Sequence, residues 1–158
     1  MSKEKVMTAD PGMMTEPTRT VDAAGTQAWY VNGQLHRLDG PAVIYANGDQ
    51  EWRVAGQLHR LDGPAVIYAD GSQEWRVNGQ RHRLDGPAYI GADGHQAWRV
   101  AGQLHRLDGP AVIYANGDQE WRVRGQNITT QVNSWMQTQA VTWPWDDQTQ
   151  MMFMLTWG

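Results

Sequence analysis

The chain has 158 residues, with 9 Trp, 17 Gly, no Cys and a formal net charge of -4. A hydrophobic fraction of 41% predicts a chain that folds, and the lack of Cys excludes disulfides, thiolate metal sites and cysteine nucleophiles. The mildly acidic balance argues against a nucleic-acid-binding surface. Because the sequence has no run of about 18 apolar residues and its first residues lack the apolar core of a signal peptide, we expect it in the cytoplasm of the producing or infected cell.

Three zones follow one another along the chain. Residues 1–22 hold both lysines and few large apolar groups, and this composition predicts a disordered tail. Residues 23–126 form a repeat array, and residues 127–158 form a segment of different character. The period of the array is 23 residues, which indicates a repeat architecture. Its structural positions are Trp29, Trp52, Trp75, Trp98 and Trp121, His36, His59, His82 and His105, and Gly40, Gly63, Gly86 and Gly109.

Each repeat is predicted to consist of strands and turns. Residues 50–54 and 65–69 have strand length and β-branched or aromatic content. Pairs such as Asn78-Gly79 favour two-residue hairpin turns, and Asp70-Gly71 marks a second reversal in the unit. Near-identical copies need an even number of reversals, so we expect residues 61–64 to form a bend or bulge inside one long strand, with one hairpin per repeat. The predicted fold is all-β: a single extended antiparallel sheet of hairpins with a small cap that contains helix.

Two-residue turns would also fix the pairing of side chains. One face would collect Trp, Val, Tyr and His and form the core, and the other would carry Glu, Arg, Leu, Ile and Ala. The expected cross-strand pairs are Val54 with Gln57, Arg53 with Leu58, Trp52 with His59, Glu51 with Arg60, Tyr68 with Gln73, Ile67 with Glu74 and Val66 with Trp75.

The third repeat differs from the others. Tyr89 replaces a Val and Gly91 replaces a Tyr two residues later, which is typical of compensated packing, and Tyr89 would then lie opposite Trp98. Because Arg81, His95 and Ala97 are changed as well, the alternative is a binding specialisation of this unit.

The array resembles a known repeat family. The pattern Trp52-x3-Gly56-x2-His59-x3-Gly63, followed by Asp70-Gly71, is similar to MORN repeats and especially to bacterial and viral variants. The HRxDGPA motif is also similar to motifs in uncharacterised repeat proteins of bacteriophages and large viruses. The resemblance implies an extended sheet of hairpins and a role in protein or lipid contact, scaffolding or antitoxin-like binding. Arg-Leu-Asp-Gly-Pro replaces the usual Gly-x-Gly after the His, and the usual Tyr-x-Gly before the Trp is absent.

The C-terminal segment has a helical pattern. Ile128, Val132 and Trp135 have i, i+4, i+7 spacing, which predicts an amphipathic helix at about 129–138 with Thr129 or Thr130 as N-cap. Asp146-Asp147 could cap another helical turn, and residues 151–157 are apolar enough for a buried strand or helix. An open sheet needs a cover at its end, so we expect a cap. Alternatively, this Met- and Trp-rich stretch is an interaction surface.

The repeated polar residues do not predict catalysis. Equivalent residues of adjacent hairpins lie about 9.5–10 Å apart, whereas a zinc ion needs its nitrogen ligands within about 2.1 Å. We therefore expect no metal: His59 packs on Trp52, with a local pair to Asp62 as an alternative, and His95 is a solvated turn residue. The sequence has no GxSxG motif, thiol or phosphate loop, so neither an enzyme nor a cofactor is expected. The arginine rows, with a Glu51-Arg60 pair, indicate a charge-paired solvated face.

Binding functions remain. The first is a rigid protein-interaction module or scaffold, a viral or mobile-element protein that engages a host or virion component. The second is a small-ligand or glycan binder that stacks its ligand on Trp52, Trp75, Trp98 and Tyr side chains. Membrane-surface binding is a third, less favoured function, and homo-oligomerisation could use the open sheet edge near Trp29. The candidate partner-binding residues are Arg81, Tyr89, His95, Trp143, Trp145, Met152 and Phe153.

Overall fold

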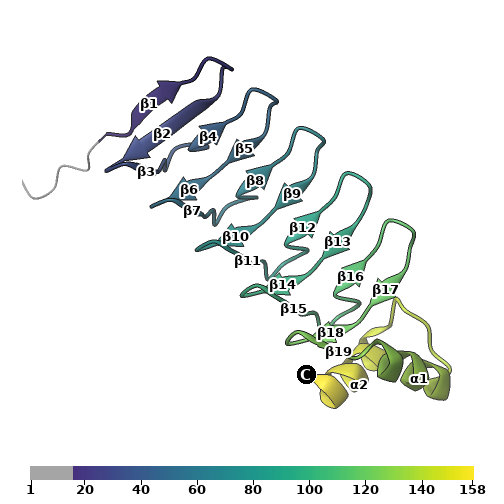
Figure 1. Cartoon of the computed structure of the whole chain (residues 1–158). Helices are drawn as coiled ribbons and strands as arrows, with labels where there is room; N and C mark the ends of the chain where they lie inside the picture. The colour runs from purple at the N-terminus through teal and green to yellow at the C-terminus, as the bar shows by residue number, and fades with distance from the viewer. Residues whose placement is uncertain (1–15) are drawn as a thin grey trace, which may run out of the picture.

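The computed structural model describes residues 16–158, so the first 15 residues of the predicted tail lie outside the described part of the chain. The described part is a row of short β-hairpins that ends in two helices (Figure 1). This arrangement confirms the predicted fold class. The strands are β1 (Thr18–Val21), β2 (Gln27–Val31), β3 (Gln34–Leu35), β4 (Val43–Ile44), β5 (Gln50–Glu51), β6 (Arg53–Val54), β7 (Gln57–Leu58), β8 (Val66–Ile67), β9 (Gln73–Glu74), β10 (Arg76–Val77), β11 (Gln80–Arg81), β12 (Tyr89–Ile90), β13 (Gln96–Ala97), β14 (Arg99–Val100), β15 (Gln103–Leu104), β16 (Val112–Ile113), β17 (Gln119–Glu120), β18 (Arg122–Val123) and β19 (Gln126–Asn127). The helices are α1 (Thr129–Gln139) and α2 (Asp147–Trp157).

One antiparallel sheet runs through all the repeats. Its order is β1-β2-β4-β5-β8-β9-β12-β13-β16-β17, with β3 on β2. Each later repeat adds a two-stranded hairpin beside this sheet, such as β6-β7. Successive hairpins are joined by backbone bonds, for example from the Gly79 N–H to the Leu58 carbonyl at 2.8 Å. Backbone pairing therefore connects the repeats along their whole length.

The first reversal of each repeat follows the prediction. Val54 pairs with Gln57 and Arg53 pairs with Leu58. Ala55 and Gly56 have φ angles of 47° and 79°, as both central residues of a type I′ turn require.

The second reversal does not follow it. Ile67 pairs with Gln73 and Val66 pairs with Glu74, one residue away from the predicted register. The loop is longer because the Tyr68 N–H bonds to the Ser72 carbonyl and leaves three residues in the turn, with Gly71 at a φ of 89°.

This one-residue shift corrects the predicted faces, because side chains alternate along a strand. Val66 lies directly opposite Glu74, and the Tyr68 hydroxyl donates to the Glu74 carboxylate at 3.2 Å. Val, Tyr and Glu therefore share one face, and Trp lies on the other. For the same reason Tyr89 pairs with Ala97, not with Trp98.

Residues 61–64 do not reverse the chain, as predicted. β7 is antiparallel to β6 and β8 is antiparallel to β5, so β7 and β8 run in the same direction. The segment is more than a bulge, however. The Trp52 carbonyl accepts from the His59 N–H, and the Trp52 N–H donates to the Ala65 carbonyl, so the residues between them loop out opposite a single tryptophan.

The N-terminal edge differs from the prediction in two ways. Thr18–Val21 belongs to the predicted tail but forms β1, which pairs with β2 in the register Arg19 to Trp29. The edge near Trp29 is therefore covered by β1, because an unpaired row of backbone groups on β2 is satisfied by an added strand. The exposed edge of the sheet is β1 itself.

The C-terminal segment covers the last repeat with an apolar cluster. Ile128, Val132 and Phe153 are buried with Trp121 and Val123 of the fourth repeat. The helix at 129–138 is confirmed as α1, but neither Thr caps it: the Thr129 hydroxyl accepts the Trp121 N–H instead.

The end of the chain is helical and mostly exposed. α2 is capped by Asp146, whose carboxylate accepts the Thr149 N–H at 2.8 Å, as predicted. Within α2 the Phe153 side chain is buried, whereas Met151 and Leu155 are 64% and 83% exposed. The expectation of a buried apolar segment therefore holds only on one side of the helix.

Candidate functional site

The RLDGP segment of each repeat folds around its own arginine. The Arg60 guanidinium lies 4.1 Å from the centroid of the Trp52 ring. Its Nε donates to Asp62 at 2.9 Å and its Nη1 donates to the Pro64 carbonyl at 3.2 Å. A Cβ on Gly63 would lie only 2.9 Å from the Arg60 Cζ. The motif is therefore a clamp in which glycine leaves room for a guanidinium stacked on an indole. The same stack is formed by Arg37 on Trp29, Arg83 on Trp75 and Arg106 on Trp98.

The second arginine row pairs with glutamate. Arg53 Nε donates to Glu51 at 2.7 Å, so the predicted Glu51-Arg60 pair is wrong. The reason is alternation: residues 51 and 53 share one face of a strand, whereas Arg60 lies in the loop on the Trp side. The equivalent pairs are Glu74 with Arg76 and Glu120 with Arg122.

The repeated histidines connect neighbouring repeats. The Nδ1 atom of His82 accepts the Ala101 N–H at 3.1 Å, in the hairpin turn that joins the third repeat to the fourth. His36, His59 and His105 lie near the corresponding turns. Arginine, not histidine, stacks on the Trp ring, so the predicted packing of His59 on Trp52 is replaced by this link. Among residues 16–158 no group of three or more His, Asp or Glu is placed to hold a metal ion.

The RLDGP loops present a row of leucines. Leu38, Leu61 and Leu84 are 66%, 80% and 79% exposed, because the arginine and aspartate of each loop already hold it in place. Grooves lie between consecutive loops: one of about 770 Å³ has Trp52 and Val54 in its lining. We call Leu38, Leu61 and Leu84, with these grooves, the leucine ladder.

The fourth loop has the same sequence but a different environment. Leu107 packs against the C-terminal apolar cluster, as Trp143 and Trp145 also do. The groove that precedes it, of about 670 Å³, is lined in part by Gln150 and Met154 of α2. A helix of this chain therefore covers the end of the leucine ladder.

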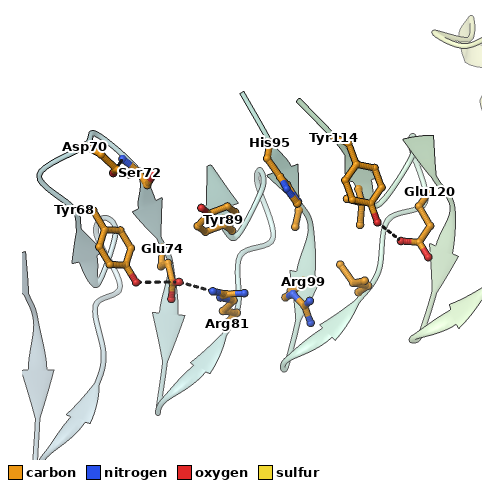
Figure 2. A pocket seen from close by; sticks show the side chains of 13 residues that line it. Tyr68, Asp70, Ser72, Glu74, Arg81, Tyr89, His95, Arg99, Tyr114 and Glu120 are labelled. Carbon is orange, nitrogen blue, oxygen red and sulfur yellow. Dashed lines mark hydrogen bonds and ion pairs between the residues drawn. The ribbon is translucent and has the colours of Figure 1, made fainter. Parts of the chain in front are cut away.

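The other face of the sheet carries a pocket at the third repeat (Figure 2). It has a volume of about 390 Å³, and the predicted residues Arg81, Tyr89 and His95 all line it. His95 is therefore part of a pocket wall and not only a turn residue. Its ring meets the edge of Tyr89 at 5.6 Å and a tilted Tyr114 at 5.2 Å, measured between centroids.

The electrostatics of this pocket are asymmetric. Burial opposes ionisation of Glu74, but hydrogen bonds from Arg81 and Arg76 outweigh it and hold the pKa of Glu74 below its usual value. Burial lowers the pKa of Arg99, and the neighbouring guanidinium of Arg81 lowers it further. Both effects disfavour the positive charge of Arg99, so an anion beside it would be stabilised.

Sequence reasoning missed Arg99, which also lines the pocket. Every full repeat has an arginine at the position of Arg99, so the identity of this residue does not mark the third repeat as different. The signal lies two residues earlier, where Ala97 replaces the glutamate that pairs with this arginine in the other full repeats.

The other predicted binding residues lie in the cap. Trp145 stacks on Trp121 with centroids 4.7 Å apart, and Phe153 has no exposed surface. Trp143 approaches Arg106 at 5.9 Å, and Met152 is 37% exposed. The four do not form one surface, and Phe153 packs in the core.

Comparisons with known proteins leave the relationship open. The sequence matches no protein-family model, and a search of curated proteins returns no significant relative. The similarity to MORN repeats therefore stays a prediction. Neither helix of the described residues has the length and apolar character needed to cross a membrane.

Proposed function

We propose that the protein is a non-enzymatic protein-binding module, and that its leucine ladder receives an amphipathic helix of a partner protein. The observation that carries the proposal is the contrast between identical loops. Leu107 is covered by the apolar cluster of the cap, whereas Leu38, Leu61 and Leu84 are 66–80% exposed. Leucines in a regular exposed row favour a contact surface over a chance distribution.

The chain itself supplies the precedent for a helical occupant. Met154 and Gln150 of α2 line the groove beside Leu107, and the helix buries Phe153 behind it. A partner helix on the earlier repeats would make the same kind of contact in the grooves floored by Trp and Val. Helix-in-groove binding is a common mode of peptide recognition.

The repeat spacing specifies the partner's sequence pattern. Equivalent loops lie about 9.5–10 Å apart, because each repeat adds two strands to the main sheet. A helix rises about 1.5 Å per residue, so one repeat corresponds to roughly 6 or 7 residues. A partner helix that follows the ladder should carry large apolar residues about seven positions apart.

The glycan and membrane alternatives have less support. The rings of Trp52, Trp75 and Trp98 each have an arginine guanidinium 3.9–4.1 Å from the centroid, which occupies a face that a sugar would need. The arginines of this row also bond to neighbouring aspartates and carbonyls, as Arg60 does. They are therefore already engaged and are poorly placed to collect lipid headgroups.

The proposal is tested with displayed helical peptides that carry leucines at varied spacings. Selection on the full chain should enrich seven-residue spacing. The triple variant Leu38→Ser, Leu61→Ser, Leu84→Ser should bind the selected peptides at least about 10-fold more weakly and keep its melting temperature, because these side chains are exposed. The control Leu155→Ser removes an equally exposed leucine from α2 and should bind normally. If Leu155→Ser loses binding and the triple variant does not, the C-terminal segment is the working surface and the proposal is wrong.

A further inference from the structure

The unusual residues of the third repeat converge on one place. At five positions this repeat differs from all three other full repeats, namely Arg81, Tyr89, Gly91, His95 and Ala97. Arg81, Tyr89 and Ala97 line the same pocket, and a Cβ on Gly91 would lie 3.3 Å from the Tyr89 hydroxyl. Random drift would scatter such changes over both faces of the hairpin, so their convergence indicates a site.

The neighbouring repeats show what the pocket lacks. In the second repeat Glu74 accepts from Arg76 Nε at 2.6 Å and from the Tyr68 hydroxyl at 3.2 Å. Figure 2 shows the side chains of Tyr68 and Glu74, and the equivalent Tyr114 and Glu120, projecting from the same face. Each such repeat thus holds one carboxylate on its arginine.

The third repeat keeps the arginine and loses the carboxylate. Arg99 Nη1 donates to the Gly102 carbonyl at 2.8 Å. Its Nε is buried and has no hydrogen-bond partner among residues 16–158. With Ala97 in place of glutamate, Arg99 is the one member of the row Arg53, Arg76, Arg99 and Arg122 that forms no ion pair within the described chain. A buried donor of this kind is costly unless a ligand satisfies it.

The Tyr89 ring takes the place of the tyrosine ring that is missing at Gly91, but no side chain takes the place of the carboxylate that is missing at Ala97. Its hydroxyl approaches Gly91, where the other full repeats have a tyrosine. Together with His95 and Tyr114 it forms a wall of aromatic rings, and Leu104 and Val112 add apolar surface. The wall suits a flat, largely apolar body next to the charged group.

The flanking carboxylates select the charge of the ligand. Glu74 and Glu120 both line the pocket, and each forms an ion pair with the arginine two residues after it. They would repel a doubly charged phosphate, whereas a single carboxylate reproduces the pattern of the other repeats.

We propose that the third-repeat pocket binds a small monocarboxylate with a planar apolar body. The carboxylate accepts from Arg99 in the place of the missing glutamate, and the body lies among Tyr89, His95 and Tyr114. This site is on the opposite sheet face from the leucine ladder and does not depend on the proposed protein binding.

The first experiment titrates the full chain with benzoate and follows heat or amide chemical shifts. We expect saturable binding at one site, with shifts centred on the pocket. The neutral benzamide has the same ring but no charge and should bind at least about 10-fold more weakly. Inorganic phosphate should also bind more weakly than benzoate.

Two variants locate the site. Ala97→Glu introduces the carboxylate that the other full repeats have at this position. The variant should bind benzoate at least about 10-fold more weakly and keep or raise its melting temperature. Ala46→Glu adds the same charge at an exposed turn of the first repeat and should bind benzoate normally. Should Ala97→Glu fail to fold, Arg99→Gln removes the donor and should cause the same loss.

The outcomes separate cleanly. Loss in Ala97→Glu or Arg99→Gln with retention in Ala46→Glu supports the site. No saturable binding of benzoate, equal binding of benzamide, or unchanged affinity in the folded pocket variants would overturn it. Tighter binding of phosphate than of benzoate would show that the ligand class is wrong.

Discussion

The arginine clamp makes a quantitative prediction for Gly63→Ala. Gly63 is not among the positive-φ residues, so its backbone accepts alanine without strain. The added Cβ would lie 2.9 Å from the Arg60 Cζ, while the Trp52 ring blocks retreat on the other side at 4.1 Å. The guanidinium must therefore leave the clamp.

The cost follows from the contacts that are lost. The cation-π contact contributes about 0.5–2 kcal/mol, and the charged hydrogen bond to the Pro64 carbonyl contributes about 1–2 kcal/mol when partly exposed. Asp62 is 84% exposed, so its pair with Arg60 is screened and is not counted. We expect Gly63→Ala to lower the free energy of unfolding by about 1.5–4 kcal/mol, or the melting temperature by about 3–16 °C.

A double-mutant cycle tests the mechanism. Arg60→Ala should cost a similar amount, and Gly63→Ala added to Arg60→Ala should cost less than about 0.5 kcal/mol, because the atoms that it displaces are gone. Urea unfolding followed by Trp fluorescence measures all four proteins. Gly56→Ala is the control: Gly56 has a φ of 79° and an open Cβ position, so its cost should be the same with or without Arg60. Equal costs of Gly63→Ala in the two backgrounds would refute the clamp.

Three further predictions concern single interactions. The pKa of folded Glu74 lies below its usual 4.5, so its ion pairs stabilise the fold fully above about pH 4.5 and less as the pH falls through the lowered pKa. Glu74→Gln should therefore destabilise the chain by about 1.5–3 kcal/mol at pH 7 and flatten the acid limb of a plot of melting temperature against pH. Asp146→Ala should cost about 1 kcal/mol in urea unfolding, because the Thr149 N–H at the start of α2 loses its acceptor. His82→Ala should cost about 0.5–1.5 kcal/mol and accelerate hydrogen exchange at the Ala101 N–H, which it leaves unpaired.

Most of the fold could be predicted from the sequence, because a glycine-containing turn determines the geometry of its hairpin locally. Ala55-Gly56 and its equivalents allow a single compact two-residue turn, and the pairs across it are as predicted. Asp70-Gly71 is ambiguous, since the same dipeptide also closes a three-residue loop with only its glycine at positive φ. A three-residue loop in place of a two-residue turn moves the register by one residue. Val66 therefore lies opposite Glu74 and not, as predicted, opposite Trp75.

Only some residues of the candidate site could be predicted from the sequence. Unusual residues such as Tyr89 and His95 stand out against near-identical copies, and they do line one pocket. Arg99 does not stand out, because its importance comes from the loss of a partner. The leucines show that identical motifs can lie in different environments. Leu84 and Leu107 occur in the same RLDGP motif, yet Leu84 is 79% exposed and Leu107 packs against the cap. A repeat motif determines the local loop, while contacts from outside the repeat decide what the loop does.

The two proposed sites should act independently, because strand alternation places them on opposite faces. Glu51 and Arg53 point to the pocket face, and Trp52 between them points to the grooves of the leucine ladder. Ala97→Glu should therefore leave binding of selected helical peptides unchanged, and the triple leucine variant should bind benzoate with unchanged affinity. Saturating benzoate should also shift peptide affinity by less than about 2-fold, since neither ligand has contacts that depend on the other. A larger shift in a titration of both ligands would show that the thin sheet transmits binding from one face to the other.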